Sequence, residues 1–439
     1  MQDRFFTLVD ELKGGLKAGE VLLAGLSGER SDFIRFNNSL VRQPGTVHQD
    51  YLSLELIRAQ RHAAATVTIC GGAEDRALAE KTIGELRASL DHLPDDPYLL
   101  YSTEVRSSEQ IGRDELTDPA AVLEAILSAG QGRDLVGIHA QGQVYEGFAN
   151  SLGQRNWFST HSFQFDWSFY LRADKAVKCN YAGFRWDEAA FARKVDAAAK
   201  QLEVLAREPK TIAPGGYRAY LAPSALREYV GMVCYGGFGL KAHRTKTTPL
   251  LKMAEGEAGL SPVVSLAENT AEGIAPNFQS AGYVKPPRVS LVEKGRLAQL
   301  LVSPRSAKEY NVPTNAAAAH EAPESLDMAG GDLPAQEAAS RLGEGVYVNS
   351  LWYLNYSDRP GARLTGMTRF ATFWVEGGRI VAPLNVMRFD DTAYRVLGEK
   401  LEALTSEREF LVSTSTYGGR STASVRLPGA FLSELALTL

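Results

Sequence analysis

The chain has 439 residues, 44% hydrophobic and 23% charged, with a formal net charge of −5 and a sequence pI near 5.9. Its length and composition are typical of a globular protein with more than one domain. The acidic balance argues against non-specific binding to DNA or to an anionic membrane, because both need a basic surface. Met1–Leu16 has the apolar spacing of a helix rather than of a secretory leader, and no stretch reaches the roughly 20 apolar residues that span a bilayer. We therefore expect a cytoplasmic protein that binds neither nucleic acid nor membrane directly.

The first half of the chain predicts a helix–strands–helix unit that occurs twice. In the first unit, after the N-terminal helix, alternation of apolar residues predicts strands over Val21–Ala24, Asp32–Arg42, Val47–Ile57 and His62–Cys70, and a helix over Glu74–Leu90. The second unit has predicted helices over Asp118–Ala129 and Asp187–Arg207, with strands over Leu135–Ala140, Tyr145–Ser151, Gln154–Thr160 and Phe163–Arg172.

The two units also share a short sequence. Phe36–Leu40 reads FNNSL and Phe148–Leu152 reads FANSL. Together with the shared order of helices and strands, this repeated sequence predicts an internal duplication. Its two copies would span about 1–95 and 115–207, within an N-terminal α+β domain of residues 1–212. The proline- and glycine-containing stretch Glu208–Gly216 favours a domain boundary there.

Residues 213–439 form the second predicted domain, in which strand and loop patterns dominate. Strands are expected over Tyr217–Leu221, Val346–Tyr356 and Met367–Val375, a helix within Met387–Leu404, and a long surface loop over Thr314–Leu333. The expected fold class is therefore α+β, with a duplicated helix–antiparallel-sheet domain followed by a β-rich domain.

The helix expected after Pro223 has the outline of a metal-binding motif without its ligands. Its residues Arg227, Glu228 and Met232 stand where a peptidase helix would need an imidazole, a carboxylate and a second imidazole. Arginine cannot coordinate a cation, because it stays protonated and has no acceptor, and a thioether is a poor ligand for zinc. A general base in peptide hydrolysis needs a water polarised by a metal. We expect Glu228 to be a structural or solvent-facing carboxylate.

The chain resembles the TldD/PmbA family, most clearly in Tyr347–Phe373, which reads YVNSLWYLNYSDRPGARLTGMTRFATF. The resemblance implies a metallopeptidase-like C-terminal domain whose catalytic members carry His-Glu-x-x-x-His on this helix and a cysteine ligand near the C-terminus. On that pattern the histidines fall on Arg227 and Met232, the cysteine falls near Tyr417, and only Glu228 remains. This loss implies the TldE (PmbA-like) branch, with no catalytic residue, no metal and no cofactor in this chain.

Asn349–Tyr356 and the following Thr365–Arg369 form the stretch richest in aromatic residues. Alternation places Trp352, Leu354 and Tyr356 on one face of a strand. Two interpretations stay open: core strands packed on both faces, or a groove edge that pairs with an extended peptide. The resemblance implies the substrate-groove side of the C-terminal domain, with the candidate residues Trp352, Tyr353, Asn355, Tyr356, Thr365 and Arg369.

The resemblance also implies a partnership. TldE-like chains pair with a TldD-like zinc peptidase in a closed chamber that cleaves unfolded polypeptides, including peptide-antibiotic precursors and antitoxins, and the family is also called modulators of DNA gyrase. One alternative is a homodimer that captures extended peptides without cutting them. Another is a peptidase with a relocated metal site, using Glu228 and distant histidines. Against it, none of the seven histidines forms H-x-x-x-H or H-E-x-x-H, and the three cysteines form no C-x-x-C pair.

Overall fold

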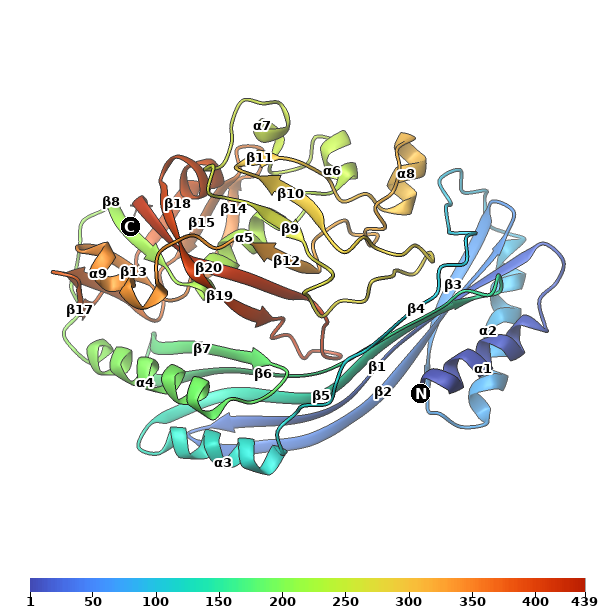
Figure 1. Ribbon diagram of the computed structural model, residues 1–439, viewed down its shortest axis with the longest axis horizontal. Helices are drawn as coiled ribbons and strands as arrows, with labels where there is room; N and C mark the ends of the chain where they lie inside the picture. Colours follow the sequence, from blue (N-terminus) through green and yellow to red (C-terminus); the bar gives the residue numbers. More distant parts are fainter. Residues whose placement is uncertain (439) are drawn as a thin grey trace.

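The computed structural model describes residues 1–438. Within them the strands form two mostly antiparallel sheets that share no strand, one built from residues 20–183 and the other from residues 215–437. The second sheet and its helices sit above one face of the first sheet, and helices lie along the opposite face (Figure 1). The predicted α+β class with a β-rich C-terminal part is confirmed.

The first sheet has the strand order β3-β2-β1-β5-β6-β4, with β7 paired to β6. Its strands are β1 (Glu20–Asn37), β2 (Leu40–Arg58), β3 (Arg61–Ile69), β4 (Ser108–Ile111), β5 (Asp134–Asn150), β6 (Arg155–Arg172) and β7 (Lys175–Gly183). The helices of this half are α1 (Gln2–Lys13), α2 (Glu74–Leu90), α3 (Pro119–Gly130) and α4 (Glu188–Leu205).

Several strands are longer than the sequence predicts. β1 continues through its polar middle, because β2 and β5 pair with it on both sides there. The strand expected over Asp32–Arg42 is wrong at its end, since Asn38 and Ser39 form a hairpin turn with φ of 50° and 56°. The predicted strand fragments of the second unit likewise join into β5 and β6.

The FNNSL and FANSL sequences fall at matching places. The first spans the turn between β1 and β2, and the second spans the turn between β5 and β6. Each turn follows the first long strand of a unit, in the orders α1-β1-β2-β3-α2 and α3-β5-β6-β7-α4. This correspondence supports the predicted duplication, whose boundaries stay predictions.

Alternation decides which face of the first sheet the helices cover. Even-numbered residues of β1 and β2 pack against α1 and α2 in a core that includes Leu22, Leu26, Leu52, Leu54, Leu56, Phe5 and Ile83. Odd-numbered aromatic residues of β6 pack with residues of α3 and α4 in a core that includes Phe163, Phe165, Trp167, Phe169, Ile126 and Phe191. The remaining face of the sheet is therefore turned towards the C-terminal half.

The second sheet has the order β11-β10-β9-β12-β20-β8-β13-β16-β17, with β19 and β18 also pairing with β20 and a branch β18-β15-β14. Its strands are β8 (Gly215–Leu221), β9 (Leu266–Glu268), β10 (Val289–Glu293), β11 (Arg296–Leu297), β12 (Ser325–Met328), β13 (Gly345–Val348), β14 (Trp352–Asp358), β15 (Arg363–Met367), β16 (Thr372–Glu376), β17 (Arg379–Pro383), β18 (Arg388–Thr392), β19 (Leu401–Val412) and β20 (Ser424–Leu437). The helices are α5 (Pro223–Cys234), α6 (Leu240–Arg244), α7 (Leu251–Ala254), α8 (Pro304–Tyr310) and α9 (Ala338–Leu342).

One expectation for this half holds in part and one is wrong. The helix expected within Met387–Leu404 is present as a short π-helical segment over Arg395–Glu399, while β18 and the start of β19 take up the rest, because pairing with β15 and β20 overrides the local apolar spacing there. The surface loop expected over Thr314–Leu333 contains β12, whose residues are all buried and run parallel to β20 inside the sheet. Four residues are too few to show a strand pattern.

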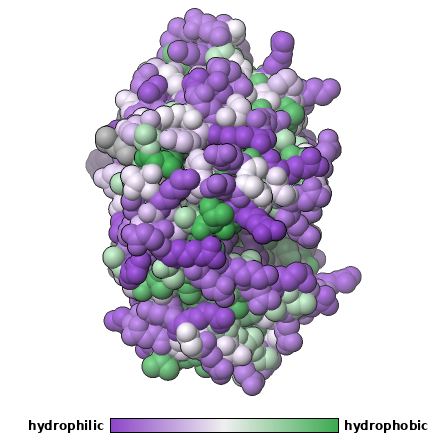
Figure 2. Space-filling model, turned by 90° about the vertical axis from the view of Figure 1, so that its left-hand side faces the viewer, coloured by the Kyte–Doolittle hydropathy of each residue, from purple (hydrophilic) through white to green (hydrophobic). Residues whose placement is uncertain are grey.

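Within residues 1–438 no helix is both long enough and apolar enough to cross a membrane. The three cysteines are free: Cys70 is exposed, and burial raises the pKa values of Cys179 and Cys234 to about 12. Figure 2 shows the end of the molecule that carries α4, α9 and β17. Its surface is mostly hydrophilic, with hydrophobic residues scattered among charged ones.

Candidate functional site

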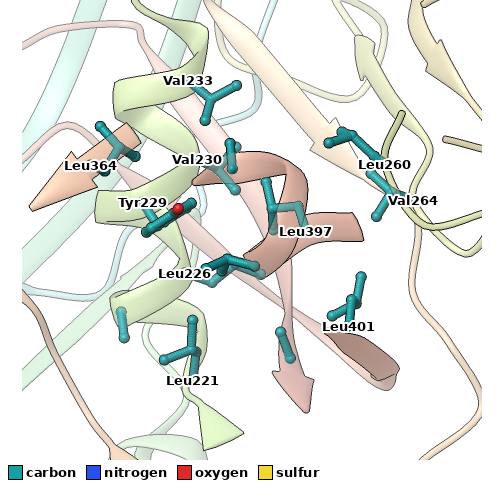
Figure 3. Close-up of a cluster of buried hydrophobic side chains, with 14 of the residues drawn as sticks. Leu221, Leu226, Tyr229, Val230, Val233, Leu260, Val264, Leu364, Leu397 and Leu401 are labelled. Atoms are coloured by element: carbon teal, nitrogen blue, oxygen red, sulfur yellow. The ribbon is translucent and has the colours of Figure 1, made fainter. Parts of the chain in front are cut away.

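The helix α5 is held by its apolar face. Its residues Leu226, Tyr229, Val230 and Val233 are buried in the C-terminal core, near Leu364, Leu397 and Leu401 (Figure 3). That packing decides which side chains face away from the core. Glu228 is exposed, whereas Arg227 and Met232 are half-buried.

The charge of Arg227 is influenced by that of Asp166, a residue of β6 in the other half of the molecule. Burial lowers the pKa of Arg227, and the charges of Glu228 and Asp166 oppose that shift. Burial raises the pKa of Asp166, and the charges of Lys178 and Arg227 oppose it. Asp166 Oδ1 also accepts a hydrogen bond of 2.6 Å from Asn180 Nδ2. The first ligand position of the family motif therefore holds a half-buried cation within the field of two carboxylates.

Met232, at the second ligand position, packs against neighbouring hydrophobic residues. Its side chain lies against the C-terminal core, and its carbonyl oxygen accepts a hydrogen bond of 2.6 Å from the Tyr356 hydroxyl. Burial raises the pKa of Tyr356, so this hydroxyl keeps its proton and remains a donor. The contact ties α5 to β14.

The third ligand position, Tyr417, lies in the loop over 413–423 between β19 and β20, which descends onto the first sheet (Figure 1). The Arg420 guanidinium anchors this loop by donating to the Gly142 carbonyl (3.1 Å), the Ser162 carbonyl (2.8 Å) and Ser162 Oγ (2.7 Å). The Gly418 carbonyl accepts a further hydrogen bond of 2.7 Å from Gln49 Nε2. Tyr417 itself is fully exposed, at 101%.

These residues do not fit a zinc ion. A guanidinium has no lone pair to offer, and a fixed positive charge at Arg227 repels a metal cation. A thioether is a poor zinc ligand, and Tyr417 projects into solvent. Across residues 1–438 no group of three or more His, Cys, Asp or Glu side chains is placed to hold a metal ion.

A trough with a volume of about 880 Å³ lies between the first sheet and this loop. Residues of β1, β2, β5 and β6 form its floor, Lys178 of β7 also lines it, and Thr416–Gly419 form one rim. Asp166 and Tyr417, which belong to separate parts of the sequence, both line this trough. Sequence reasoning missed it, because its floor consists of polar residues alternating with buried ones, the pattern of a solvent-facing strand side.

The aromatic stretch lies on β14, an edge strand that pairs only with β15 among the described strands. Trp352 is 40% exposed and Tyr353 is 70% exposed, with their ring centroids 5.4 Å apart. The Arg369 guanidinium carbon lies 4.5 Å from the centroid of the Trp352 ring. Asn349 Nδ2, just before β14, donates to the carbonyl of Lys178, a residue that lines the trough, at 2.8 Å.

The predicted alternation fails at the start of β14. The register is irregular between Trp352 and Asn355, and Tyr353 has a φ of 56°. Such a bulge turns one side chain away from its expected face. Trp352 is therefore exposed, while Leu354 and Tyr356 of its predicted face are half-buried.

The other candidate groove residues have mixed surroundings. Thr365 Oγ1 donates to the Phe389 carbonyl at 3.0 Å and accepts from Arg388 Nε at 2.8 Å, which uses its hydroxyl inside the sheet. Tyr356 is tied to α5, whereas Asn355 is exposed beside the aromatic pair. Trp352, Tyr353, Asn355 and Arg369 thus remain available to a ligand, and their role stays a prediction.

Comparison with known proteins identifies the family. Residues 214–438, just over half of the chain, match the family model described as the PmbA/TldA metallopeptidase C-terminal domain. The chain belongs to the PmbA/TldD family. Among curated proteins, no relative matches it.

Solved structures of PmbA/TldD-type proteins share the whole fold. TldE from Thermococcus kodakarensis superimposes with a TM-score of 0.74 at 12% identity, covering 99% of this chain and 100% of that one. A proposed modulator of DNA gyrase from Thermotoga maritima gives 0.76 at 13% identity, covering 99% of both chains. One from Bacteroides thetaiotaomicron gives 0.73 at 16% identity, covering 99% of this chain and 98% of that one. Identities this low establish the shared fold and not a shared activity.

Proposed function

We propose that this chain is a metal-free, catalytically inactive TldE/PmbA-like subunit that pairs with a TldD-like zinc metallopeptidase. The pair would act in the proteolysis of unfolded peptides, such as peptide-antibiotic precursors and antitoxins, in the cytoplasm. The observation that carries the proposal is Arg227, a half-buried guanidinium with no lone pair to offer at the position where the family motif has a zinc ligand. Zinc would then be held by the partner alone.

The features that remain suit a substrate-holding role. Asp166 and Lys178 line the trough, and the Lys178 carbonyl accepts a hydrogen bond from Asn349, just before the free edge of β14. An edge strand offers unpaired main-chain donors and acceptors to an extended chain. Main-chain pairing tolerates many sequences, as a protein that handles unfolded peptides requires.

Co-expression with a TldD-like protein tests the partnership. We expect the two chains to elute together on size exclusion, and we expect peptidase activity on an unfolded polypeptide that chelation of the partner's zinc removes. The chain alone should show no peptidase activity and no stoichiometric zinc by elemental analysis. Separate elution, with no gain of activity on mixing, would contradict the proposal, and stoichiometric zinc in the isolated chain would revive a relocated peptidase site.

The second candidate is a homodimer that captures extended peptides without hydrolysis. It is favoured by one observation: the trough and the β14 edge are complete within a single chain. Light scattering on the chain alone and with the TldD-like protein separates the two candidates. A stable homodimer that does not exchange subunits would favour the second.

A further inference from the structure

The trough is lined by more cations than anions, although the chain as a whole carries a net charge of −5. Its charged residues are Arg35, Arg42, Lys178, Glu29 and Asp166. A concave, cationic surface on an acidic protein concentrates negative ligands, because the cavity walls focus the local field. The charge of the trough therefore differs in sign from that of the protein around it.

Both carboxylates that line the trough already accept hydrogen bonds from other residues of the chain. Glu29 accepts hydrogen bonds from Ser31 Oγ (2.7 Å), Gln49 Nε2 (2.7 Å) and the Arg420 backbone nitrogen (3.3 Å). Asp166 accepts from Asn180 and lies within the fields of Lys178 and Arg227. Neither carboxylate is therefore a strong partner for an incoming cation.

Two of the cations are unengaged. Arg35 and Arg42 are exposed, and neither forms a salt bridge or a side-chain hydrogen bond within residues 1–438. They flank an irregularity in the β1–β2 pairing, where Arg35 pairs with Gln43 and Phe36 pairs with Val41, so that Arg42 has no partner residue. A bulge of this kind directs an extra side chain out of the regular pattern.

This chemistry suits carboxylates on a flexible chain. A guanidinium offers a planar fork of donors that matches a carboxylate bidentately, and it is weakly hydrated. Phe33, Tyr51 and Tyr417 add aromatic surface along the same trough. An extended segment can place its carboxylates against the two arginines while its other residues contact these rings.

We propose that the trough selects extended polypeptide segments rich in aspartate and glutamate, with Arg35 and Arg42 as the residues that recognise their carboxylates. The inference rests on the peptide capture in the proposed function and adds the class of peptide that is captured.

Fluorescence anisotropy on the full chain tests this selection. Three labelled, unfolded peptides of equal length and equal aromatic content are compared, one acidic, one neutral and one basic. We expect the acidic peptide to bind at least about tenfold more tightly than the neutral one at low salt, and the difference to shrink as salt screens exposed charges. The double variant R35E/R42E should lose this preference and still bind the neutral peptide.

The matched control is R296E/R379E, which changes the net charge equally at exposed residues of β11 and β17 outside the trough lining. It should keep the preference for the acidic peptide. Equal binding of the three peptides, or an unchanged preference in R35E/R42E, would overturn the inference and leave peptide capture standing. Failure of all three peptides to bind would contradict peptide capture itself.

Discussion

Replacing Arg420 with alanine is expected to destabilise the protein by about 2–4 kcal/mol and to release the loop between β19 and β20. The Arg420 guanidinium donates to two main-chain carbonyls and one hydroxyl of the first sheet. Burial lowers its pKa to about 10, with the charge of Glu29 opposing the shift, so the group remains charged at neutral pH. Its removal takes these charged donors away from the carbonyls of Gly142 and Ser162.

Urea unfolding measures the loss of stability, and cleavage by chymotrypsin after the exposed Tyr417 reports release of the loop. Arg420→Lys keeps the charge without the fork of donors, so an intermediate loss is expected. Arg426→Ala is the matched control, since that half-buried side chain lies over the Phe410 ring and makes a single hydrogen bond within residues 1–438, of 3.3 Å, to the Glu272 carbonyl. Equal stability of the two alanine variants would show that Arg420 does not hold the halves together.

Ionisation of Glu146 is expected to lower the free energy of unfolding of the wild-type protein as pH rises from about 4.5 to about 7. The Glu146→Gln variant, which has no proton to lose at this position, is expected to lack this contribution to the pH dependence. Glu146 lies on β5, where Thr422 Oγ1 of the descending loop donates to it at 3.4 Å. Burial and, to a lesser degree, the charge of Glu324 raise its pKa to about 7, against the opposing effects of Lys285 and of the hydrogen bond from Thr422.

Because the pKa of Glu146 is higher in the folded protein than in the unfolded chain, its contribution to stability falls as pH rises. The folded protein keeps a proton on Glu146 that the unfolded chain releases near pH 4.5, so the contribution to stability is complete below that pH. It is lost as pH rises through the folded pKa of about 7. At pH 8 the glutamine variant should therefore be more stable than wild type by about 1–3 kcal/mol.

Urea unfolding at a series of pH values checks this expectation. Glu293→Gln, at the exposed end of β10, serves as the control and should follow the wild-type profile. Parallel profiles for wild type and Glu146→Gln between pH 4.5 and 8 would mean that Glu146 does not titrate in this way.

Part of the candidate site follows from residue identity alone. Arg227 lacks the donor chemistry of a zinc ligand in any fold, because coordination requires a lone pair, and the thioether of Met232 is a poor zinc ligand. Amphipathic spacing is equally local, which is why the predicted helix over Glu74–Leu90 agrees with α2. The sequence by itself therefore determined the chemistry of the side chains at these two positions and most of the longer helices.

The tertiary structure decided what lies opposite these residues. Asp166 influences the charge of Arg227, and Gln49 donates to the carbonyl of Gly418, only because one half of the chain folds onto the sheet of the other. Two-residue alternation shows that a strand has a polar side, but it does not show whether solvent or another domain covers that side. The trough, the exposure of Trp352 and the burial of β12 depend on such distant pairings, and these are set by packing between segments rather than by local sequence.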